Sequence, residues 1–472
     1  MTDQTRRQRP LGLIRHIHMV GIGGIGMSSI AEVLLLRGYV VSGSDLSLSS
    51  VTDHLNSLGA TVFGDHDREH VESADVVVYS SAVRPKENPE TVEAERLRIP
   101  LIRRDEMLGE LMRMKYGIAI AGTHGKTTTT SMTGVVIGAA GFDPTIIVGG
   151  KVAAFGSNAV TGEGDLIVIE ADEYDRTFLR LTPVVAVITT IEEEHLDTYR
   201  DLNDIRDAFT QFANSVPFFG AAVLCLDDPN VQSIIPRLDR RIITYGTSRQ
   251  ADIRAEDVVQ TGTEIRFAVN KGKVRVGEIA VGMPGLHNVR NALAAVAVGL
   301  ELEIPFETIR KALRRFSGVQ RRFEVKGEGR GVLVVDDYGH HPTEIKATLE
   351  AAATAWPGRR LIAVFQPHLY SRTLLFKEGF ARAFFNADLL VVTDVYPARE
   401  DPIDGVDGMT IVGAVTQAGH KDVRYVSDKN DLPDFLSVVV KSGDVVITLG
   451  AGDIWRFGEQ FMTSYFQEAN HV

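Results

Sequence analysis

The stretch Ala121-Gly122-Thr123-His124-Gly125-Lys126-Thr127-Thr128-Thr129-Thr130 decides the fold of this chain. It follows an apolar run, residues 116–120, and precedes a segment with a helical pattern, residues 131–137. A strand, a glycine-rich turn and a helix cradle the phosphates of a nucleoside triphosphate, because backbone N–H groups and the helix dipole both attract anions. The lysine adds a mobile cation, and the next hydroxyl holds Mg²⁺. Ile120 stands where the common motif has glycine, which leaves open a plain glycine turn with a surface lysine.

The composition limits the classes of protein to which this chain can belong. At 472 residues it is too long for one hydrophobic core, so roughly two to four domains are expected. The formal net charge of -12 argues against a surface that binds nucleic acid through many phosphate contacts. Cys225 is alone, which excludes an intrachain disulfide and fits a cytoplasmic protein. The sequence contains no run of about 18 apolar residues, so no membrane span is expected. Residues 1–10 are expected to form a polar tail.

Residues 14–115 alternate between apolar strands and helical patterns, which predicts a parallel sheet with crossover helices. The turn after the strand at 17–20 has the G-x-G-x-x-G spacing, at Gly21, Gly23 and Gly26. Asp45 follows about 20 positions later, where an acid usually holds a ribose hydroxyl. The pattern fits a dinucleotide or any other nucleotide diphosphate, and glycines that only pack a helix on a strand are the alternative. Ser81 follows another strand, where its hydroxyl either contacts the ligand or only forms hydrogen bonds within a turn.

The second unit carries carboxylates at the ends of its strands. Glu170 ends an apolar strand downstream of the phosphate loop, which is the usual position of a second Mg²⁺ ligand, and residues 170–175 contain four carboxylates. His195 follows the strand at 184–190 among further acids, where it can reach the same cation or serve a structural role. Residues 221–282 are rich in strand patterns, and the alternation at 263–269 predicts an antiparallel sheet.

Two amides and a third α/β unit complete the chain. Asn288 and Asn291 lie three residues apart on one face of a helix, where amides suit adenine, although Asn288 alone is better explained as a helix cap. After residue 325 four apolar strands each end in polar residues, which predicts a ligand face at one edge of a sheet. We expect domains at residues 1–114, 115–325 and 326–472.

Taken together, these motifs resemble the Mur ligases, in order and over nearly the whole chain. The segments that carry the resemblance are His18 to Met27, Ala121 to Thr128, Glu170 to Glu173, His195 to Asp197, His287 to Asn291, Arg321 to Phe323 and Asp336 to Pro342. The resemblance implies an N-terminal Rossmann-like parallel sheet, a central P-loop ATPase-type α/β domain with an extra antiparallel sheet, and a C-terminal Rossmann-like domain. It departs in the three acids before His195, of which Glu193 and Glu194 fit a solvated position.

The family implies an ATP-dependent ligase that forms an amide through an acyl phosphate. The turn with Ile-Gly-Gly-Ile-Gly-Met and the segment Asp-Tyr-Gly-His-His-Pro favour the member that adds L-alanine to UDP-N-acetylmuramate in peptidoglycan synthesis. The implied cofactors are ATP and Mg²⁺. The implied partners are these small molecules, without nucleic acid or membrane, in a monomer or weak homodimer. A second phosphate loop with an acidic cluster has no use in a redox enzyme, which argues against a nicotinamide dehydrogenase.

The resemblance also assigns roles to residues, one motif at a time. The implied catalytic residues are Lys126, Glu170, His195 and Arg322, and the implied metal ligands are Thr127, Glu170 and His195. The implied ATP contacts are Gly122, Thr123, His124, Gly125, Lys126, Thr127, Thr128, Asn288, Asn291, Arg322 and Asp337. The implied contacts to the UDP end of the sugar nucleotide are Gly21, Gly23, Gly24, Ile25, Gly26, Ser44, Asp45 and Ser81. The implied alanine pocket consists of Tyr338, His340, His368 and Arg372.

Two alternatives remain open at this point. One is a related ATP-dependent amide ligase, either one that attaches recycled peptides to UDP-N-acetylmuramate or one of the folyl-polyglutamate type. The other is a nucleotide sensor without catalytic activity. The presence of Lys126, Glu170 and His195 argues against the sensor.

Overall fold

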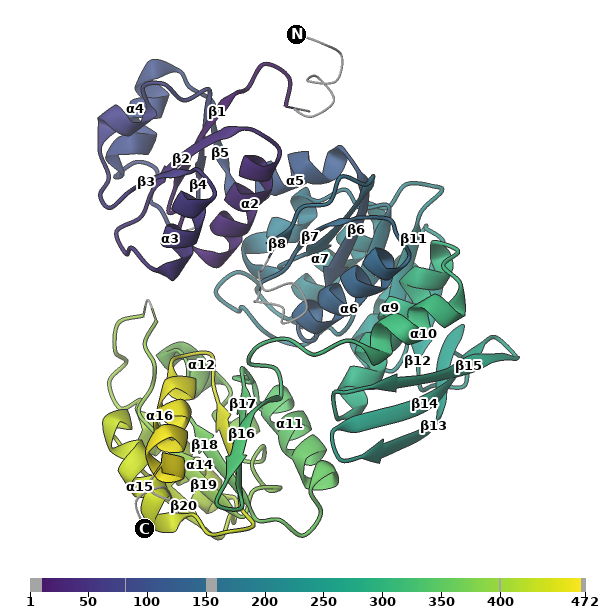
Figure 1. Ribbon diagram of the computed structural model, residues 1–472, viewed down its shortest axis with the longest axis vertical. Coiled ribbons are helices and arrows are strands. Elements are labelled where there is room, and N and C mark those ends of the chain that lie inside the picture. The colour runs from purple at the N-terminus through teal and green to yellow at the C-terminus, as the bar shows by residue number, and fades with distance from the viewer. Residues whose placement is uncertain (1–10, 81, 150–158, 399, 468–472) are drawn as a thin grey trace. The chain divides into compact units, whose positions relative to one another are not determined.

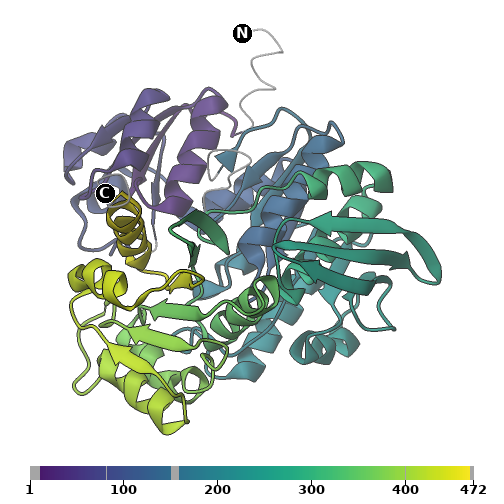
Figure 2. The ribbon, with the colours of Figure 1, turned by 60° about the horizontal axis from the view of Figure 1, so that its bottom comes forward.

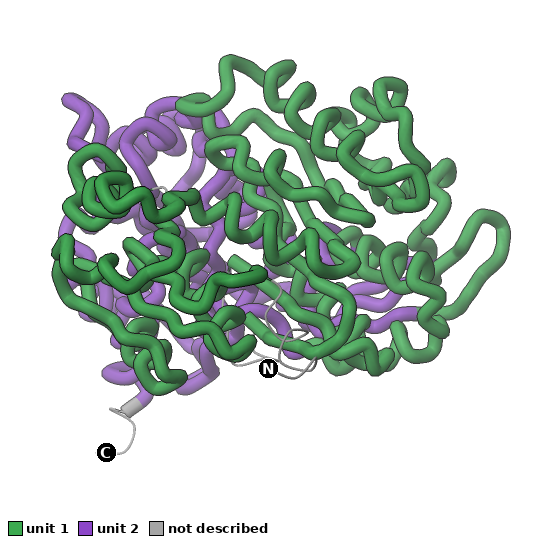
Figure 3. The backbone as a smooth tube through the Cα atoms, turned by 90° about the horizontal axis from the view of Figure 1, so that it is seen from above, with its two compact units in different colours: residues 1–256, 268–278, 290–316 green, residues 257–267, 279–289, 317–472 purple. Residues whose placement is uncertain are grey.

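The computed structural model describes residues 11–80, 82–149, 159–398 and 400–467. The predictions for the tail at residues 1–10 and for Ser81 lie outside the described residues. The chain divides into two compact units (Figure 3). One consists of residues 1–256, 268–278 and 290–316, and the other of residues 257–267, 279–289 and 317–472. No described helix is both long and apolar enough to span a membrane.

The first sheet is parallel, as predicted, and has the strand order β3-β2-β1-β4-β5 (Figure 1). Its strands are β1 (His16–Val20), β2 (Val40–Ser44), β3 (Thr61–Phe63), β4 (Val76–Tyr79) and β5 (Leu101–Arg103). Its helices are α2 (Ile25–Leu36), α3 (Ser50–Ser57), η1 (Arg68–Val71), α4 (Pro89–Leu97) and α5 (Arg104–Arg113). Helices cover both faces of this parallel sheet, so its central strands are buried, and they carry the polar side chains of His18, Ser42 and Ser44 as well as apolar ones. Their carboxyl ends meet at one edge, where the glycine turn follows β1.

The central sheet has the order β15-β14-β13-β12-β11-β10-β6-β9-β7-β8, and its pairings from β13 to β7 are parallel. The strands of this part are β6 (Tyr116–Ala121), β7 (Thr145–Ile147), β8 (Ala159–Val160), β9 (Leu166–Glu170), β10 (Val185–Ile188), β11 (Ala221–Cys225) and β12 (Ile242–Gly246). The helices are α6 (Lys126–Ala139), η2 (Tyr174–Arg180), α7 (Leu202–Asn214), α8 (Pro229–Ile234), η3 (Ile235–Arg237), α9 (Leu286–Glu301) and α10 (Phe306–Arg314). β8 is antiparallel to β7.

The last three strands of this sheet, which lie side by side in Figure 2, are β13 (Ile253–Thr261), β14 (Glu264–Lys271) and β15 (Val274–Val281). Gly262 and Gly272 begin the two short connections, with φ of 58° and 59°. Such tight turns join only antiparallel neighbours, and a positive φ there favours glycine. The predicted antiparallel segment is therefore present, as an extension of the parallel sheet.

The third sheet has the order β16-β17-β21-β18-β19-β20. Its strands are β16 (Glu324–Gly329), β17 (Val332–Asp337), β18 (Leu361–Phe365), β19 (Leu389–Val392), β20 (Val423–Tyr425) and β21 (Val445–Leu449). Its helices are α11 (Pro342–Ala355), α12 (Tyr370–Leu375), α13 (Lys377–Phe380), α14 (Gly408–Gln417), η4 (Lys429–Asp431), α15 (Leu432–Val439) and α16 (Ile454–Gln467). β16 is antiparallel to β17, while the other pairings are parallel. The four strands predicted after residue 325 correspond to β17, β18, β19 and β21, which confirms the three-part α/β fold.

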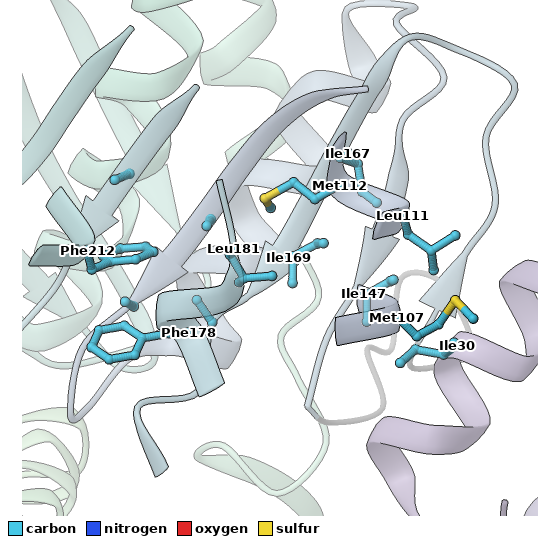
Figure 4. Close-up of a cluster of buried hydrophobic side chains, with 14 of the residues drawn as sticks. Ile30, Met107, Leu111, Met112, Ile147, Ile167, Ile169, Phe178, Leu181 and Phe212 are labelled. Atoms are coloured by element: carbon cyan, nitrogen blue, oxygen red, sulfur yellow. The ribbon is translucent and has the colours of Figure 1, made fainter. Parts of the chain in front are cut away.

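One hydrophobic cluster joins the first sheet to the central sheet (Figure 4). Met107, Leu111 and Met112 of α5 belong to it together with Ile30 of α2 and Ile167 of β9, and all five are buried. The elements that carry the two glycine-rich turns therefore share a core. Helix α5 supplies apolar side chains to it immediately before β6 and the phosphate loop begin.

Candidate active site

The loop between β6 and α6 has the backbone of an anion-binding turn. Gly122 and Gly125 have φ of 136° and 81°, in the region that favours glycine. Gly125 is also the N-cap of α6, so the N–H groups of the helix's first turn, from Lys126 on, point toward the loop. The strand, turn and helix predicted from the sequence are all present.

Two threonines that follow β10, the strand beside β6, hold this loop in place. The Thr189 hydroxyl donates to the carbonyl of His124 at 2.5 Å, and the N–H of His124 donates to the Thr190 hydroxyl at 3.0 Å. The N–H of Thr123 donates to the Thr190 carbonyl at 2.9 Å. The sequence analysis did not assign these threonines to the site. Their position at the end of a strand was the only signal that could have found them.

Lys126 lies in the loop with a buried carboxylate as its partner. Its Nζ donates to Glu173 Oε2 at 2.7 Å and Oε1 at 3.0 Å, and to the Gly122 carbonyl at 2.7 Å. Burial alone would lower the pKa of Lys126, but the charges of Glu173 and Asp172 raise it well above its usual value. Burial raises the pKa of Glu173, and the charge of Lys126 opposes this. Glu173 belongs to the predicted acidic run but was not assigned a role.

Thr127 and Glu170 form the pair expected to hold a divalent cation. The Thr127 hydroxyl donates to Glu170 Oε1 at 3.1 Å, and the N–H of Gly149 donates to Glu170 Oε2 at 2.7 Å. A hydroxyl and a carboxylate at the start of a phosphate-binding helix are hard oxygen donors, which Mg²⁺ prefers together with phosphate oxygens and water. The residues therefore fit a Mg²⁺ ion that also contacts the triphosphate.

His195 lies beside the same group of charges. Its Nε2 is 3.8 Å from Glu173 Oε1, and its ring makes an edge contact with Tyr174 at 5.2 Å between centroids. Its φ of 56° is unusual for a residue other than glycine. Of the acids before it, Glu193 is exposed, whereas Glu194 is buried and therefore not solvated as expected.

The two predicted adenine-binding amides have different surroundings. Asn291 is buried, and its Oδ1 accepts a bond from the Thr129 hydroxyl at 3.1 Å. A Cβ added to Gly125 would lie 2.5 Å from the same oxygen, so Asn291 packs directly against the phosphate loop. Asn288, also buried, donates from Nδ2 to the Pro284 carbonyl at 2.8 Å.

The glycine turn after β1 is held by Ser44, which ends β2, and by Asp45, which follows it. The N–H groups of Gly21 and Ile22 donate to the Ser44 carbonyl at 2.8 and 3.0 Å. The N–H of Gly23 donates to Asp45 Oδ2 at 2.9 Å. Ser44 is buried, and its hydroxyl donates to a buried carboxylate at 2.6 Å, so it contributes to the turn through its carbonyl.

Two further predicted turn residues lie where this loop becomes a helix. Gly24 is the N-cap of α2, and Ile25 begins the helix. A Cβ added to Gly26 would collide with the guanidinium of Arg104. A Cβ added to Gly24, by contrast, would meet only the Gly21 carbonyl oxygen, at 3.5 Å.

Four residues of the predicted amino-acid pocket come together at the carboxyl edge of the third sheet. The rings of Tyr338 and His340 are 5.3 Å apart, and those of His340 and His368 are 6.0 Å apart. Arg372 Nη1 is 3.1 Å from His368 Nδ1. Tyr396, which the sequence analysis missed, stacks on His368 at 5.7 Å. An arginine among aromatic rings can bind a small amino acid by its carboxylate.

Arg322 and Asp337 lie beside this pocket. The Arg322 guanidinium lies 5.0 Å from the Tyr338 ring centroid and 3.5 Å from Glu344 Oε1. Asp337 is buried and accepts N–H bonds from Phe323 at 2.8 Å and Gly339 at 2.7 Å. Burial raises the pKa of Asp337 to about 6, although the charge of Arg322 opposes this.

Comparisons with known proteins agree with the three-part organisation. Three family models match the chain in order: the Mur ligase family catalytic domain at residues 16–116, the Mur ligase middle domain at residues 120–299, and the Mur ligase glutamate ligase domain at residues 321–452. The UDP-N-acetylmuramate–L-alanine ligase of Salinibacter ruber is 64% identical over 459 residues, 97% of each chain. The enzyme of the same name from Geotalea uraniireducens is 55% identical over 95% of this chain and 97% of its own.

Solved structures show the same likeness. The UDP-N-acetylmuramate–alanine ligase of Thermotoga maritima matches with a TM-score of 0.80 at 31% identity, over 97% of this chain and all of that one. A murein peptide ligase of Psychrobacter arcticus shares the fold, with a TM-score of 0.70 at 24% identity over 96% of this chain and 98% of its own.

Proposed function

The chain belongs to the Mur ligase family, and we propose that it joins L-alanine to the lactyl carboxylate of UDP-N-acetylmuramate, with cleavage of ATP to ADP and phosphate. The observation that carries the proposal is 64% identity, over 97% of both chains, to a protein of that name. The geometry agrees with it, because such a reaction needs one site for the diphosphate of the sugar nucleotide and another for ATP. The chain has a glycine-rich turn at the start of α2 and a second at the start of α6.

In the first step an oxygen of the lactyl carboxylate attacks the γ-phosphorus of ATP, the bond to ADP breaks, and an acyl phosphate forms. Positioning and neutralisation of charge supply most of the catalysis in phosphoryl transfer. We assign to Lys126 the β- and γ-phosphates, which it reaches by giving up its bond to Glu173. Thr127, Glu170 and His195 would hold Mg²⁺, which neutralises phosphate charge when bound. Gly122, Thr123, His124, Gly125 and Thr128 complete the phosphate loop.

In the second step the neutral amino group of alanine attacks the carbonyl carbon of the acyl phosphate. The nitrogen loses a proton, and phosphate leaves with the electrons of the carbon–oxygen bond. We assign the alanine carboxylate to Arg372, with Tyr338, His340 and His368 forming the rest of the pocket.

The remaining contacts follow the same division. We assign adenine to Asn288 and Asn291, and further contacts to ATP to Arg322 and Asp337. We assign binding of the sugar nucleotide to the turn after β1 and to Ser44, Asp45 and Ser81. Ser44 holds the turn through its carbonyl. In this proposal residues 1–114 bind the UDP-sugar, residues 115–325 bind ATP, and residues 326–472 bind the amino acid. The protein works in the cytoplasm as a monomer or weak homodimer, which sedimentation at several concentrations would test.

The experiment that tests the function measures phosphate release from ATP in the presence of Mg²⁺ and UDP-N-acetylmuramate, with each amino acid added in turn. Release that depends on alanine, together with formation of UDP-N-acetylmuramoyl-alanine, is the expected result. Release only with a peptide that begins with alanine would indicate a recycling ligase instead. No release with any acceptor, together with binding of a nicotinamide dinucleotide, would contradict the assignment to a ligase.

A further inference from the structure

A buried carboxylate, Glu90, lies at the centre of a polar cluster in the first sheet that the sequence analysis did not identify. Glu90 is in the first turn of α4 and is fully buried. Four groups lie within hydrogen-bond distance of its two oxygens: His18 Nε2 at 3.2 Å, His66 Nδ1 at 2.9 Å, His70 Nδ1 at 2.9 Å and Ser44 Oγ at 2.6 Å. Burial alone would raise the pKa of Glu90, but the bonds from His18 and Ser44 lower it overall. The group is therefore an ionised carboxylate.

The contacts of His18 suit a ring that carries its proton on Nε2, the atom that faces Glu90. His16 Nδ1 is 2.9 Å from the Ser73 carbonyl, which can only accept, and His16 Nε2 is 2.7 Å from the Ser42 hydroxyl. Ser42 Oγ is in turn 2.8 Å from His18 Nδ1. When Ser42 donates to His18 Nδ1, a neutral His18 carries its proton on Nε2 and donates it to Glu90. Burial lowers the pKa of His18, in agreement with a neutral ring.

One donor to the Glu90 carboxylate is Ser44, the residue that also holds the glycine turn. Ser44 ends β2. Its hydroxyl donates to Glu90, while its carbonyl accepts the N–H groups of Gly21 at 2.8 Å and Ile22 at 3.0 Å. A single buried residue thus joins the carboxylate to the turn at the start of α2.

We propose that Glu90 is a positioning residue for the sugar nucleotide: it holds Ser44, which holds the Gly21–Gly24 turn in the shape that receives the diphosphate. The proposal rests on the proposed function, because that function assigns the sugar nucleotide to this turn. Glu90 is fully buried and acts through Ser44 rather than by contact with a ligand. The effect of Glu90 falls on the binding of UDP-N-acetylmuramate and leaves the chemistry at the phosphate loop unchanged.

Two variants test this, with KM measured separately for each of the three substrates. Glu90→Gln keeps the size of the side chain but removes its charge and places an amide among donors. Ser44→Ala removes the hydroxyl and leaves the carbonyl. Loss of a buried hydrogen bond to a charged group corresponds to an increase of roughly 10- to 100-fold in KM for UDP-N-acetylmuramate. The expected kcat and the KM values for ATP and alanine stay within about twofold of wild type, as loss of binding shared equally by the ground state and the transition state predicts.

A matched control is Asp444→Asn. Asp444 is also a buried carboxylate with a charged partner, Arg360 Nη2 at 2.8 Å, and it precedes the amino end of β21, away from the carboxyl edge of that sheet. This variant should lower the melting temperature without changing KM for UDP-N-acetylmuramate. The double variant Ser44→Ala/Glu90→Gln should have a KM for UDP-N-acetylmuramate no higher than that of the more strongly affected single variant, because both residues act on the turn through the same hydrogen bond. Effects that add would show that the Ser44 hydroxyl contacts the ligand itself, which overturns the proposal.

The remaining outcomes separate this inference from the function on which it rests. If the wild-type protein releases no phosphate with alanine, the proposed function fails, whatever the variants do. If the wild type is active and the variants change all KM values and kcat together, Glu90 has only a structural role and the inference is wrong. If Glu90→Gln does not fold, Ser44→Ala decides alone, and an unchanged KM for UDP-N-acetylmuramate overturns the proposal.

Discussion

Replacing Lys126 by methionine tests the central ion pair, because it removes a charge and leaves its partner buried. The Lys126 and Glu173 side chains are 14% and 4% exposed, and their nearest charged atoms are 2.7 Å apart. Lys126 contacts the Glu173 carboxylate directly, whereas the His195 ring lies farther away, with Nε2 3.8 Å from Oε1. Removing one partner of a buried ion pair costs about 3–5 kcal/mol of stability. For a cooperative unit of about 150–250 residues this lowers the melting temperature by roughly 6–20 °C.

The double variant Lys126→Met/Glu173→Gln gives the sharper measurement. It removes both charges, so the free energy of unfolding should recover about 0.5–3 kcal/mol of the loss seen with Lys126→Met, which is the range of coupling energies for groups in contact. Glu173→Gln alone should destabilise less, because Lys126 keeps its bonds to the carbonyls of Gly122 and Thr123. The assay is denaturation of the four proteins in the absence of nucleotide.

Activity separates the ion pair's structural role from its catalytic one. Both proteins that lack Lys126 should lose turnover by at least about 100-fold, because a positioned cation in phosphoryl transfer contributes roughly 2.7–4 kcal/mol. Binding of UDP-N-acetylmuramate should stay close to wild type in both. If Lys126→Met were as stable as wild type, or if the double variant were less stable than either single variant, the buried ion pair described here would not exist in solution.

Three further variants extend these tests. Gly125→Ala should raise KM for ATP by about tenfold or more, because a positive φ costs about 1–2 kcal/mol with a side chain and the Cβ would press on Asn291. The control is Gly138→Ala, in the last turn of α6 with open space around it, which should be neutral or slightly stabilising. Equal KM values for the two variants would refute the loop geometry. Arg372→Lys should raise KM for alanine by roughly 10-fold or more with KM for ATP unchanged, since lysine lacks the planar fork; an unchanged alanine KM would remove Arg372 from the pocket. Because burial raises the pKa of Asp337 to about 6, folding favours its protonated form. The protonated carboxyl therefore contributes to the free energy of unfolding in full below about pH 4, and this contribution is lost as the pH rises through 6. The loss amounts to roughly 3 kcal/mol in total. Asp337→Asn should flatten that part of the curve of unfolding free energy against pH, and parallel curves would show that the carboxyl titrates normally.

Local patterns were enough to predict the three α/β parts and the two glycine-rich turns. Apolar runs that end in polar residues identified β6, β9, β17 and β21, because strands buried on both faces leave a strong signal in the sequence. Motifs that depend on one short segment, such as Gly125 to Thr127, were equally readable. The resemblance to a known family then supplied what no pattern contains, the identity of the substrates.

Contacts between distant segments could not be predicted in this way. Glu90 lies 72 residues from His18 and 46 from Ser44, and nothing in its local sequence distinguishes it from a solvated glutamate in the first turn of a helix. Glu173 was visible as one of four acids, but the pattern did not show which of them reaches Lys126. Only the folded chain separates a buried acid from an exposed one, because burial depends on the packing of several elements.

Both glycine-rich turns are held in the same way, and the parallel sheet explains why. The turn after β1 is bonded to the carbonyl of Ser44, at the end of β2, and β2 is paired with β1. The loop after β6 is bonded to Thr189 and Thr190, which follow β10, and β10 is paired with β6. Neighbouring parallel strands end at the same edge of the sheet, so the residues at the end of each strand lie within hydrogen-bonding distance of the turn that follows its neighbour. The turns are therefore shaped by the protein before any phosphate arrives, and less binding free energy is spent on ordering them.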